Sequence, residues 1–142
     1  MSAVLAGVCL ALAASTADPV QVPATRFTLA WTHSIEKTRW EEDYAVERTP
    51  RGLRLLARDA RIRGSGAGME PPAGAVLRDG WYVYRPSTPP LEELHLTRSP
   101  FAADYDWCVD GRCRPLQDLL AADGGVTRLW PCEMPAQPGR LR

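Results

Sequence analysis

Two ionisable residues, His33 and Glu42, stand at positions that the alternation of the sequence assigns to apolar strand faces. A carboxylate on such a face is costly unless it is hydrogen-bonded or paired, and a nearby imidazole would offset that cost. Ionisable groups inside an aromatic patch are also typical of a binding pocket or an acid–base site. Two interpretations therefore stay open: a polar pair that fixes strand register, or a polar base in a pocket lined by Trp31, Trp40 and Tyr44.

The residues around this pair predict two strands joined by a short polar turn. Odd positions of the first strand (26–33) and even positions of the second (39–47) carry mainly apolar or aromatic residues, apart from the two ionisable ones. Placing apolar face on apolar face sets His33 opposite Trp40. His33 and Glu42 then become diagonal neighbours, about 7–8 Å apart at the backbone. The other face of the second strand is predicted to point to water through Arg39, Glu41, Asp43 and Glu47.

Nucleophilic and metal chemistry have weaker support. Ser34 follows His33 directly, and adjacent residues of a strand point to opposite faces, so the two do not form a nucleophile and its base within a strand. No G-x-S-x-G elbow occurs in the sequence. A metal site needs three or four convergent ligands, which Cys108, Cys113 and Cys132 with a histidine could supply. In an exported chain we expect a disulfide instead, and no metal.

The best-specified hairpin contains two of these cysteines. Asp110-Gly111 predicts a two-residue turn, which places Cys108 directly opposite Cys113 in a non-hydrogen-bonded pair. The expected Cα separation of about 4.5 Å lies within the disulfide range. Cys132 is then left over, either free or paired with something outside this chain.

Two loops could contact a ligand. The glycine-rich run 64–68 could cradle an anion through backbone N–H groups, but it lacks the Lys-Ser/Thr of a P-loop, so a turn between strands is favoured. Glu36 and Lys37 are predicted to be solvated turn residues, with Lys37 contacting a ligand carboxylate as the alternative.

The remaining pattern predicts an all-β fold, an antiparallel β-sandwich or barrel built from hairpins, with one short C-terminal helix at 115–122. Turn signals at 49–52 and at Asp79-Gly80 join further strands. Within the strand 53–62 the apolar phase switches, which predicts a bulge near Leu56. A last strand at 126–130 precedes a proline-rich tail.

The N-terminus predicts export. Residues 3–14 form an apolar run too short to span a bilayer, and the small residues Ser15 and Ala17 resemble a signal-peptidase site. We therefore expect a signal peptide at 1–17, a single domain at 18–142, a periplasmic or otherwise exported location, and no membrane insertion after cleavage. An apolar N-terminal strand and a single uncleaved membrane anchor are the alternatives. The equal numbers of basic and acidic residues, 17 each, give no sign of a nucleic-acid partner.

The run His33-Ser34-Ile35-Glu36-Lys37-Thr38, followed by Glu42 and Tyr44, resembles the H-S-V-E-K-T/P run and the following E-x-Y of the domain-of-unknown-function family 1850. Gly66-Ala67-Gly68-Met69 resembles that family's G-A-G stretch, and the resemblance extends from Phe27 to Leu116. It implies a small exported protein associated with TRAP-type solute transporters of the TAXI class. The motif residues carried over as ligand-binding candidates are His33, Ser34, Glu36, Lys37, Glu42, Tyr44, Gly66 and Gly68.

Together, these observations predict a non-enzymatic accessory domain that binds a ligand or a partner and needs no cofactor. The resemblance implies membrane or solute-binding components of a TRAP transporter as partners, and a small polar solute is the other candidate. Two alternatives stay open: an acid–base hydrolase that uses His33 and Glu42, and a structural envelope module in which the pair only locks the hairpin.

Overall fold

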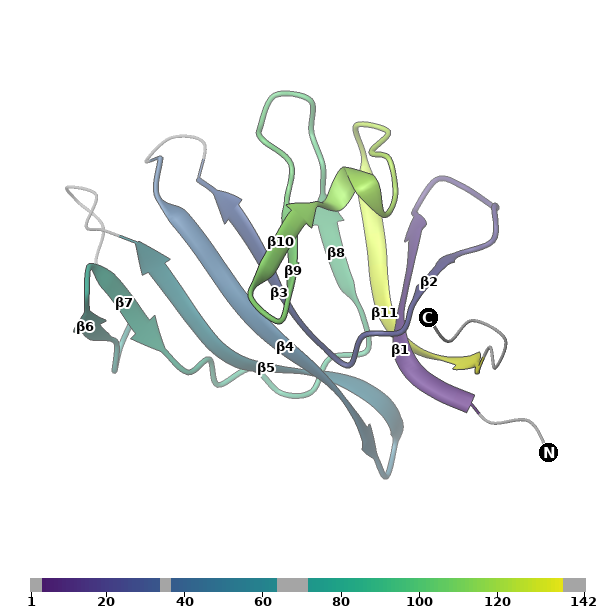
Figure 1. Cartoon of the computed structure of the whole chain (residues 1–142), viewed down its shortest axis with the longest axis horizontal. Helices are drawn as coiled ribbons and strands as arrows, with labels where there is room; N and C mark the ends of the chain where they lie inside the picture. The colour runs from purple at the N-terminus through teal and green to yellow at the C-terminus, as the bar shows by residue number, and fades with distance from the viewer. Residues whose placement is uncertain (1–3, 34–36, 64–71, 137–142) are drawn as a thin grey trace.

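The computed structural model describes residues 4–33, 37–63 and 72–136 of the chain. Its strands are β1 (Val4–Leu12), β2 (Val20–Val22), β3 (Arg26–Thr32), β4 (Arg39–Thr49), β5 (Gly52–Arg63), β6 (Val76–Arg78), β7 (Trp81–Tyr84), β8 (Leu94–Thr97), β9 (Asp106–Val109), β10 (Arg112–Pro115) and β11 (Val126–Pro135). Within these residues they form two antiparallel sheets, ordered β10-β9-β3-β4-β5-β7-β6 and β2-β1-β11-β8. The predicted all-β sandwich is confirmed. Figure 1 shows the smaller sheet at the right, while the β5–β7–β6 end of the larger sheet extends to the left.

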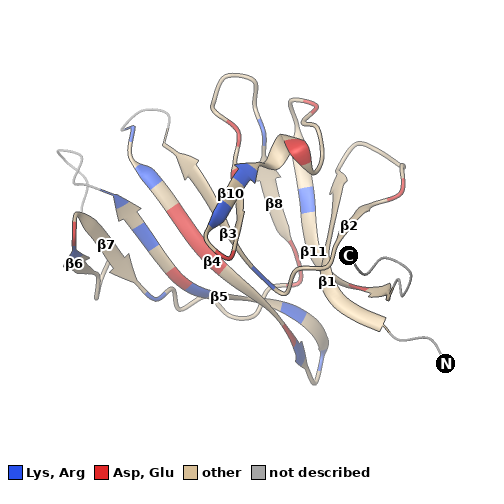
Figure 2. Ribbon diagram, in the orientation of Figure 1, with Lys and Arg blue, Asp and Glu red and all other residues tan. Residues whose placement is uncertain are grey.

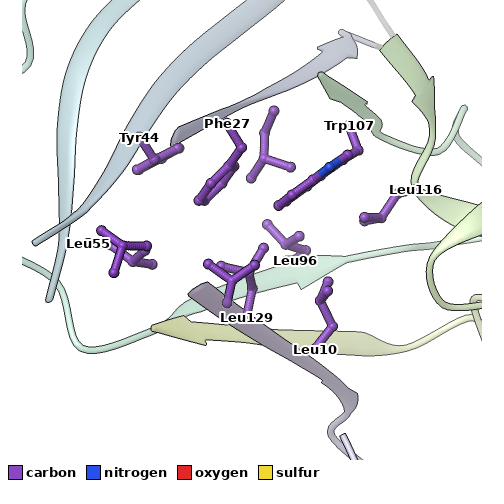
Figure 3. Close-up of a cluster of buried hydrophobic side chains, with 11 residues drawn as sticks. Leu10, Phe27, Tyr44, Leu55, Leu96, Trp107, Leu116 and Leu129 are labelled. Carbon is purple, nitrogen blue, oxygen red and sulfur yellow. The ribbon is translucent and has the colours of Figure 1, made fainter. Parts of the chain in front are cut away.

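The hydrophobic core lies between the two sheets, where alternate residues of each turn inward (Figure 3). Leu10 and Leu129 of the smaller sheet and Leu55 of the larger one are 0% exposed. Phe27 stacks on Trp107, with the ring centroids 4.6 Å apart. Because burying one large apolar side chain stabilises a fold by about 1.5–3 kcal/mol, these residues hold the sheets together.

The apolar N-terminal segment, expected as a signal peptide, forms β1 at the centre of the smaller sheet. It pairs with β11 along its whole length, and its residues Val8 and Leu10 are fully buried. Gly7 allows β2 to approach, because a Cβ atom there would lie 2.4 Å from the carbonyl oxygen of Val22. A chain beginning at Asp18 would lack all of these contacts. In the structure this segment is an apolar strand, and the signal peptide at 1–17 stays a prediction.

Two disulfides cross-link the strands. Cys108 and Cys113 face each other with Cα atoms 4.0 Å apart, which confirms the predicted pairing. Cys9 and Cys132 join β1 to β11, with Cα atoms 5.9 Å apart. The prediction that Cys132 is free or pairs outside this chain is therefore wrong, because it set Cys9 aside with the N-terminal segment. Among the described residues, no group of three or more His, Cys, Asp or Glu is placed to hold a metal ion.

Both Asp-Gly turns form two-residue hairpins, as predicted, between β6 and β7 and between β9 and β10. The φ angles are positive at both residues of each turn, at 52° and 86° for Asp79 and Gly80 and at 53° and 78° for Asp110 and Gly111. This is the geometry of a type I′ turn, whose twist matches that of the flanking strands.

The predicted C-terminal helix is reduced to a single 3₁₀ turn, Leu116–Asp118. Leu116 is fully buried and its N–H donates to the carbonyl of Tyr105, so the turn serves to fix Leu116 in the core. The side chain of Gln117 accepts a hydrogen bond from the N–H of Ala122. In a continuing helix the N–H of Ala122 would bond to a backbone carbonyl instead. The segment is also too short to nucleate a helix easily.

An ion pair with a buried arginine joins Arg98, which follows β8, to Asp104, which precedes β9. The Arg98 side chain is 1% exposed, and its guanidinium donates two hydrogen bonds to Asp104, at 2.9 and 2.6 Å. A third bond, 3.1 Å long, goes to the hydroxyl of Thr127. Burial opposes ionisation of Asp104, but its hydrogen bonds to Arg98 and to the Tyr105 backbone outweigh that effect and lower the pKa of Asp104. Among the described residues, Asp104 is therefore the carboxylate that compensates the charge of Arg98.

We expect Asp104→Asn to lower the free energy of unfolding by about 3 kcal/mol, because it leaves the Arg98 charge buried without a counterion. The matched control is Asp59→Asn, since Asp59 pairs with Arg85 at the surface and should change stability by less than about 1 kcal/mol. Urea unfolding of both variants measures the difference.

The lowered pKa of Asp104 also makes stability depend on pH. The stabilisation from the Asp104 carboxylate is complete above the unfolded-state pKa of about 3.9, and it is lost as the pH falls through the folded-state pKa. The Asp104→Asn variant should not show this loss of stability at low pH. Equal falls in the free energy of unfolding for Asp104→Asn and Asp59→Asn would contradict the prediction.

Candidate functional site

The first hairpin, β3 with β4, has the predicted faces but a different register. Trp31 lies opposite Trp40 and Leu29 lies opposite Glu42. The prediction had set His33 opposite Trp40, so the pairing is shifted by two residues. A shift of two keeps every side chain on its face, because the side-chain period of a strand is two. Glu42 accordingly stays on the inner face, as predicted, while its neighbours change.

The shift arises from a tighter turn than the sequence suggested. The N–H of His33 donates to the carbonyl of Thr38 at 2.8 Å, and the N–H of Lys37 donates back to the carbonyl of His33 at 2.9 Å. Lys37 adopts a positive φ of 58°, which closes this short turn. The buried Thr38 also accepts a hydrogen bond from the indole of Trp40.

His33 is consequently opposite Thr38, four residues before Glu42, which corresponds to about 13 Å along the strand. The stacked pair Trp31 and Trp40 lies between them, with ring centroids 6.1 Å apart. The prediction that His33 and Glu42 are diagonal neighbours is therefore wrong. His33 contacts the aromatic pair instead, since its ring centroid lies 6.5 Å from that of Trp40.

Glu42 lies in a row of inward-facing residues that crosses the larger sheet. Leu29 of β3 and Ala60 of β5 flank it, each 1% exposed, and Tyr84 of β7 follows Ala60. The predicted bulge is confirmed a few residues from Leu56: the pairing of β4 with β5 shifts between Glu42 and Tyr44. Between the pairs formed by Glu42 and by Tyr44, β5 has one residue more than β4, so the alternation of side chains along β5 changes by one residue. Ala60 therefore points to the inner face.

Three tyrosines lie around the Glu42 carboxylate. The phenol of Tyr44 donates a hydrogen bond to Glu42 Oε1 at 2.7 Å, and burial together with the charge of Glu42 raises the pKa of Tyr44. Burial and the same charge also raise the pKa of Tyr84 and of Tyr105, the latter with a further contribution from Asp104. The phenols therefore stay protonated at neutral pH, so that they can donate hydrogen bonds toward a negative centre.

Aromatic rings cover the sheet beside this carboxylate. Trp31 packs against Tyr105 with ring centroids 5.7 Å apart, and the next inward row continues through Trp40, Ile62 and Tyr82. The tryptophans and tyrosines of both rows are half-buried, as is Tyr105, whereas Tyr44 in the adjacent row is buried. We call Trp31, Trp40, Glu42, Tyr44, Tyr84 and Tyr105 the tyrosine–carboxylate cluster. It offers one negative charge, several phenol donors and accessible ring surface.

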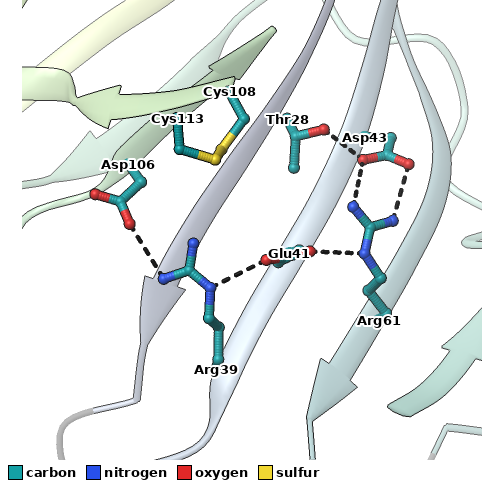
Figure 4. Close-up of polar contacts among 8 residues, drawn as sticks. All are labelled: Thr28, Arg39, Glu41, Asp43, Arg61, Asp106, Cys108 and Cys113. Atoms are coloured by element: carbon teal, nitrogen blue, oxygen red, sulfur yellow. Dashed lines mark hydrogen bonds and ion pairs between the residues drawn. A yellow bond between two sulfur atoms is a disulfide. The ribbon is translucent and has the colours of Figure 1, made fainter. Parts of the chain in front are cut away.

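The outer face of the same sheet carries a chain of ion pairs in place of the independently solvated charges that the sequence suggested (Figure 4). Arg61 of β5 bonds Asp43 and Glu41 of β4, Arg39 bonds Glu41 at 3.0 Å, and Arg39 also reaches Asp106 of β9 at 3.1 Å. Figure 2 shows acidic positions, in red, along β4 beside basic positions, in blue, along β5. These ion pairs tie three strands, β4, β5 and β9, together by their side chains.

A cavity of about 470 Å³ lies over this outer face, between the Cys108–Cys113 hairpin and β5. Its lining includes Asp43 and Arg61, which bond each other, and Arg58 and Asp59, which pair with Glu47 and Arg85 respectively. Most of its charges are thus neutralised within the protein. We therefore place the candidate site on the inner face, where Glu42 has a phenol but no cation as its partner among the described residues.

The structure brings Glu42 and Tyr44 together, places His33 at the far side of the tryptophan pair, and leaves Lys37 exposed in the turn. The other predicted ligand-binding residues lie outside the described residues; they are Ser34, Glu36, Gly66 and Gly68. Sequence reasoning missed Tyr84 and Tyr105, since these come from separate segments. The signal that could have indicated them was the presence of tyrosine in the runs 81–84, which has two, and 104–107, which has one.

These features define a class of protein, an open two-sheet β domain with a carboxylate and several tyrosines on its inner face. The chain belongs to the domain-of-unknown-function family DUF1850, whose family model matches residues 27–116. No curated protein and no solved structure matches the chain. Among the described residues, no helix is long and apolar enough to cross a membrane.

Proposed function

We propose that this protein is a non-catalytic binding domain and that the tyrosine–carboxylate cluster is its ligand-contacting surface. The observation that carries the proposal is the half-buried Glu42 carboxylate, bonded by Tyr44 and framed by Leu29 and Ala60. Keeping a charge on an apolar face costs free energy, and a single phenol compensates only part of it. A ligand that completes the hydrogen bonding of Glu42 would recover that cost.

The arrangement favours binding over acid–base catalysis. A general base needs a second group within hydrogen-bond reach, either on the substrate or beside it. The register puts the ring pair Trp31 and Trp40 between Glu42 and His33, so the two do not form a relay through direct contact. Aromatic surface with a few convergent polar groups is instead the usual composition of a small-molecule site.

The setting in which the domain works is proposed from other features. Two disulfides favour an oxidising compartment, such as the periplasm, because thiols stay reduced in the cytosol. The likeness of the His33–Tyr44 motif to proteins that accompany TRAP-type transporters supports a role as a transport accessory. In that role the cluster would contact a small polar solute or a transporter component.

A thermal-shift screen tests the binding function. We expect one class among small amines, alcohols, carboxylates, amino acids and phosphates to raise the melting temperature by several degrees at saturation. Glu42→Gln should abolish most of that shift, because it removes the charge but keeps an oxygen that accepts from Tyr44. Glu47→Gln, on the outer face of the same strand, is the matched control and should behave as wild type. A flat response to every class, or an unchanged shift in Glu42→Gln, would refute the proposal.

A further inference from the structure

The distribution of charge between the two faces of the larger sheet limits what the cluster can bind. On the outer face, Arg39 and Arg61 are both engaged by carboxylates, and Arg58 pairs with Glu47. On the inner face, the two rows that contain Glu42 and Trp40 carry one carboxylate and no basic side chain. The inner site is therefore negative, because Arg98, the arginine whose charge acts on Tyr105, is already paired with Asp104.

The groups around Glu42 suit a positive ligand. Aromatic ring faces attract cations that lie within about 6 Å of the ring centroid, and tryptophan does so most strongly. Trp31, Trp40 and Tyr105 form one continuous patch, with neighbouring centroids 5.7 and 6.1 Å apart. A carboxylate beside such a patch can accept a charge-assisted hydrogen bond from an ammonium group. An anionic ligand would meet the Glu42 charge, and the described arginine near the cluster, Arg98, is already engaged by Asp104.

We propose that the tyrosine–carboxylate cluster binds the ammonium group of a small organic cation, with Glu42 as the counterion and the Trp31–Trp40–Tyr105 patch as its apolar wall. This inference rests on the proposed binding function and specifies its ligand class. The half-buried state of Trp31, Trp40 and Glu42 leaves part of their surface accessible to such a group.

The test uses three probes with the same alkyl chain and different head groups: n-butylammonium, 1-butanol and butyrate. Titration of the full chain, followed by the indole N–H signals in two-dimensional ¹H–¹⁵N NMR, measures weak binding directly. We expect n-butylammonium to shift the Trp31 and Trp40 signals saturably and to bind about ten times more tightly than 1-butanol, because only the cation pairs with Glu42. Butyrate should bind most weakly.

Two variants test whether the charge of Glu42, rather than the packing of its side chain, determines the affinity for n-butylammonium. Glu42→Gln should reduce n-butylammonium affinity about ten-fold, to the level of 1-butanol, whereas Glu47→Gln should leave it unchanged. The dispersion of the amide signals shows whether each variant is folded. Equal affinity for all three probes, or tighter binding of butyrate, would overturn the ammonium inference while leaving a binding site in place. No response to these probes, together with a flat thermal-shift screen, would overturn the binding function as well.

Discussion

A chain that begins at Asp18 is expected not to fold. It would lose β1, which lies between β2 and β11 at the centre of the smaller sheet. Burial of Val8 and Leu10 contributes about 3–6 kcal/mol, and the Cys9–Cys132 disulfide contributes about as much again. These losses are comparable with the 5–15 kcal/mol that stabilises a typical domain. Circular dichroism and urea unfolding of the truncated chain measure the outcome.

The matched control for this truncation is a chain that begins at Val4 and keeps β1 complete. It should unfold cooperatively, with the same midpoint as the full chain. A cooperative transition in the chain that begins at Asp18 would show that β1 is dispensable. That result would favour the signal-peptide interpretation of the N-terminal segment and would contradict the central position of β1.

Replacing Cys9 and Cys132 with serine together is expected to lower the free energy of unfolding by about 5 kcal/mol. In the chain-entropy model a disulfide stabilises by restricting the unfolded chain, and the effect grows with the loop that it closes. The sequence separation of this pair is 123 residues, so it ties together nearly the whole described chain. Urea titration under oxidising conditions gives the difference in free energy directly.

The hairpin disulfide supplies the matched control. Cys108 and Cys113 are separated by 5 residues, for which the same model gives only about 2 kcal/mol. The double serine variant of this pair should therefore remain folded with a modest fall in stability. If the two double variants lost equal stability, loop length would not govern the contribution of either disulfide.

Much of the fold is encoded in short stretches and could be predicted from them. The Asp79-Gly80 and Asp110-Gly111 turns define their hairpins, because only a few residue types adopt positive φ at both turn positions. The second turn also fixes Cys108 opposite Cys113. The alternation in β3 and β4 placed Glu42 and Tyr44 on the inner face correctly, since the two-residue period does not depend on register.

The errors have a common cause in contacts between distant segments. Apolar composition in β1 fits both a signal segment and a buried strand; its pairing with β11 could not be read from the sequence, and the signal peptide stays a prediction. Cys132 could not be assigned for the same reason, because its partner is 123 residues away. The register of β3 on β4 was misjudged by two residues, since both registers place apolar face on apolar face. The turn at Lys37 decided between them.

The candidate site, too, was predictable in its local features but not in its contacts between distant segments. Sequence alone determined that Glu42 and Tyr44 share an aromatic strand face and that a carboxylate there needs a partner. Only the tertiary structure decided which groups lie around that carboxylate: it separated His33 from Glu42 and placed Tyr84 and Tyr105 near it. The physical reason is that alternation along a strand is a local property of the chain. Neighbours across a sheet come from register, bulges and loops, and these depend on the packing of the whole domain.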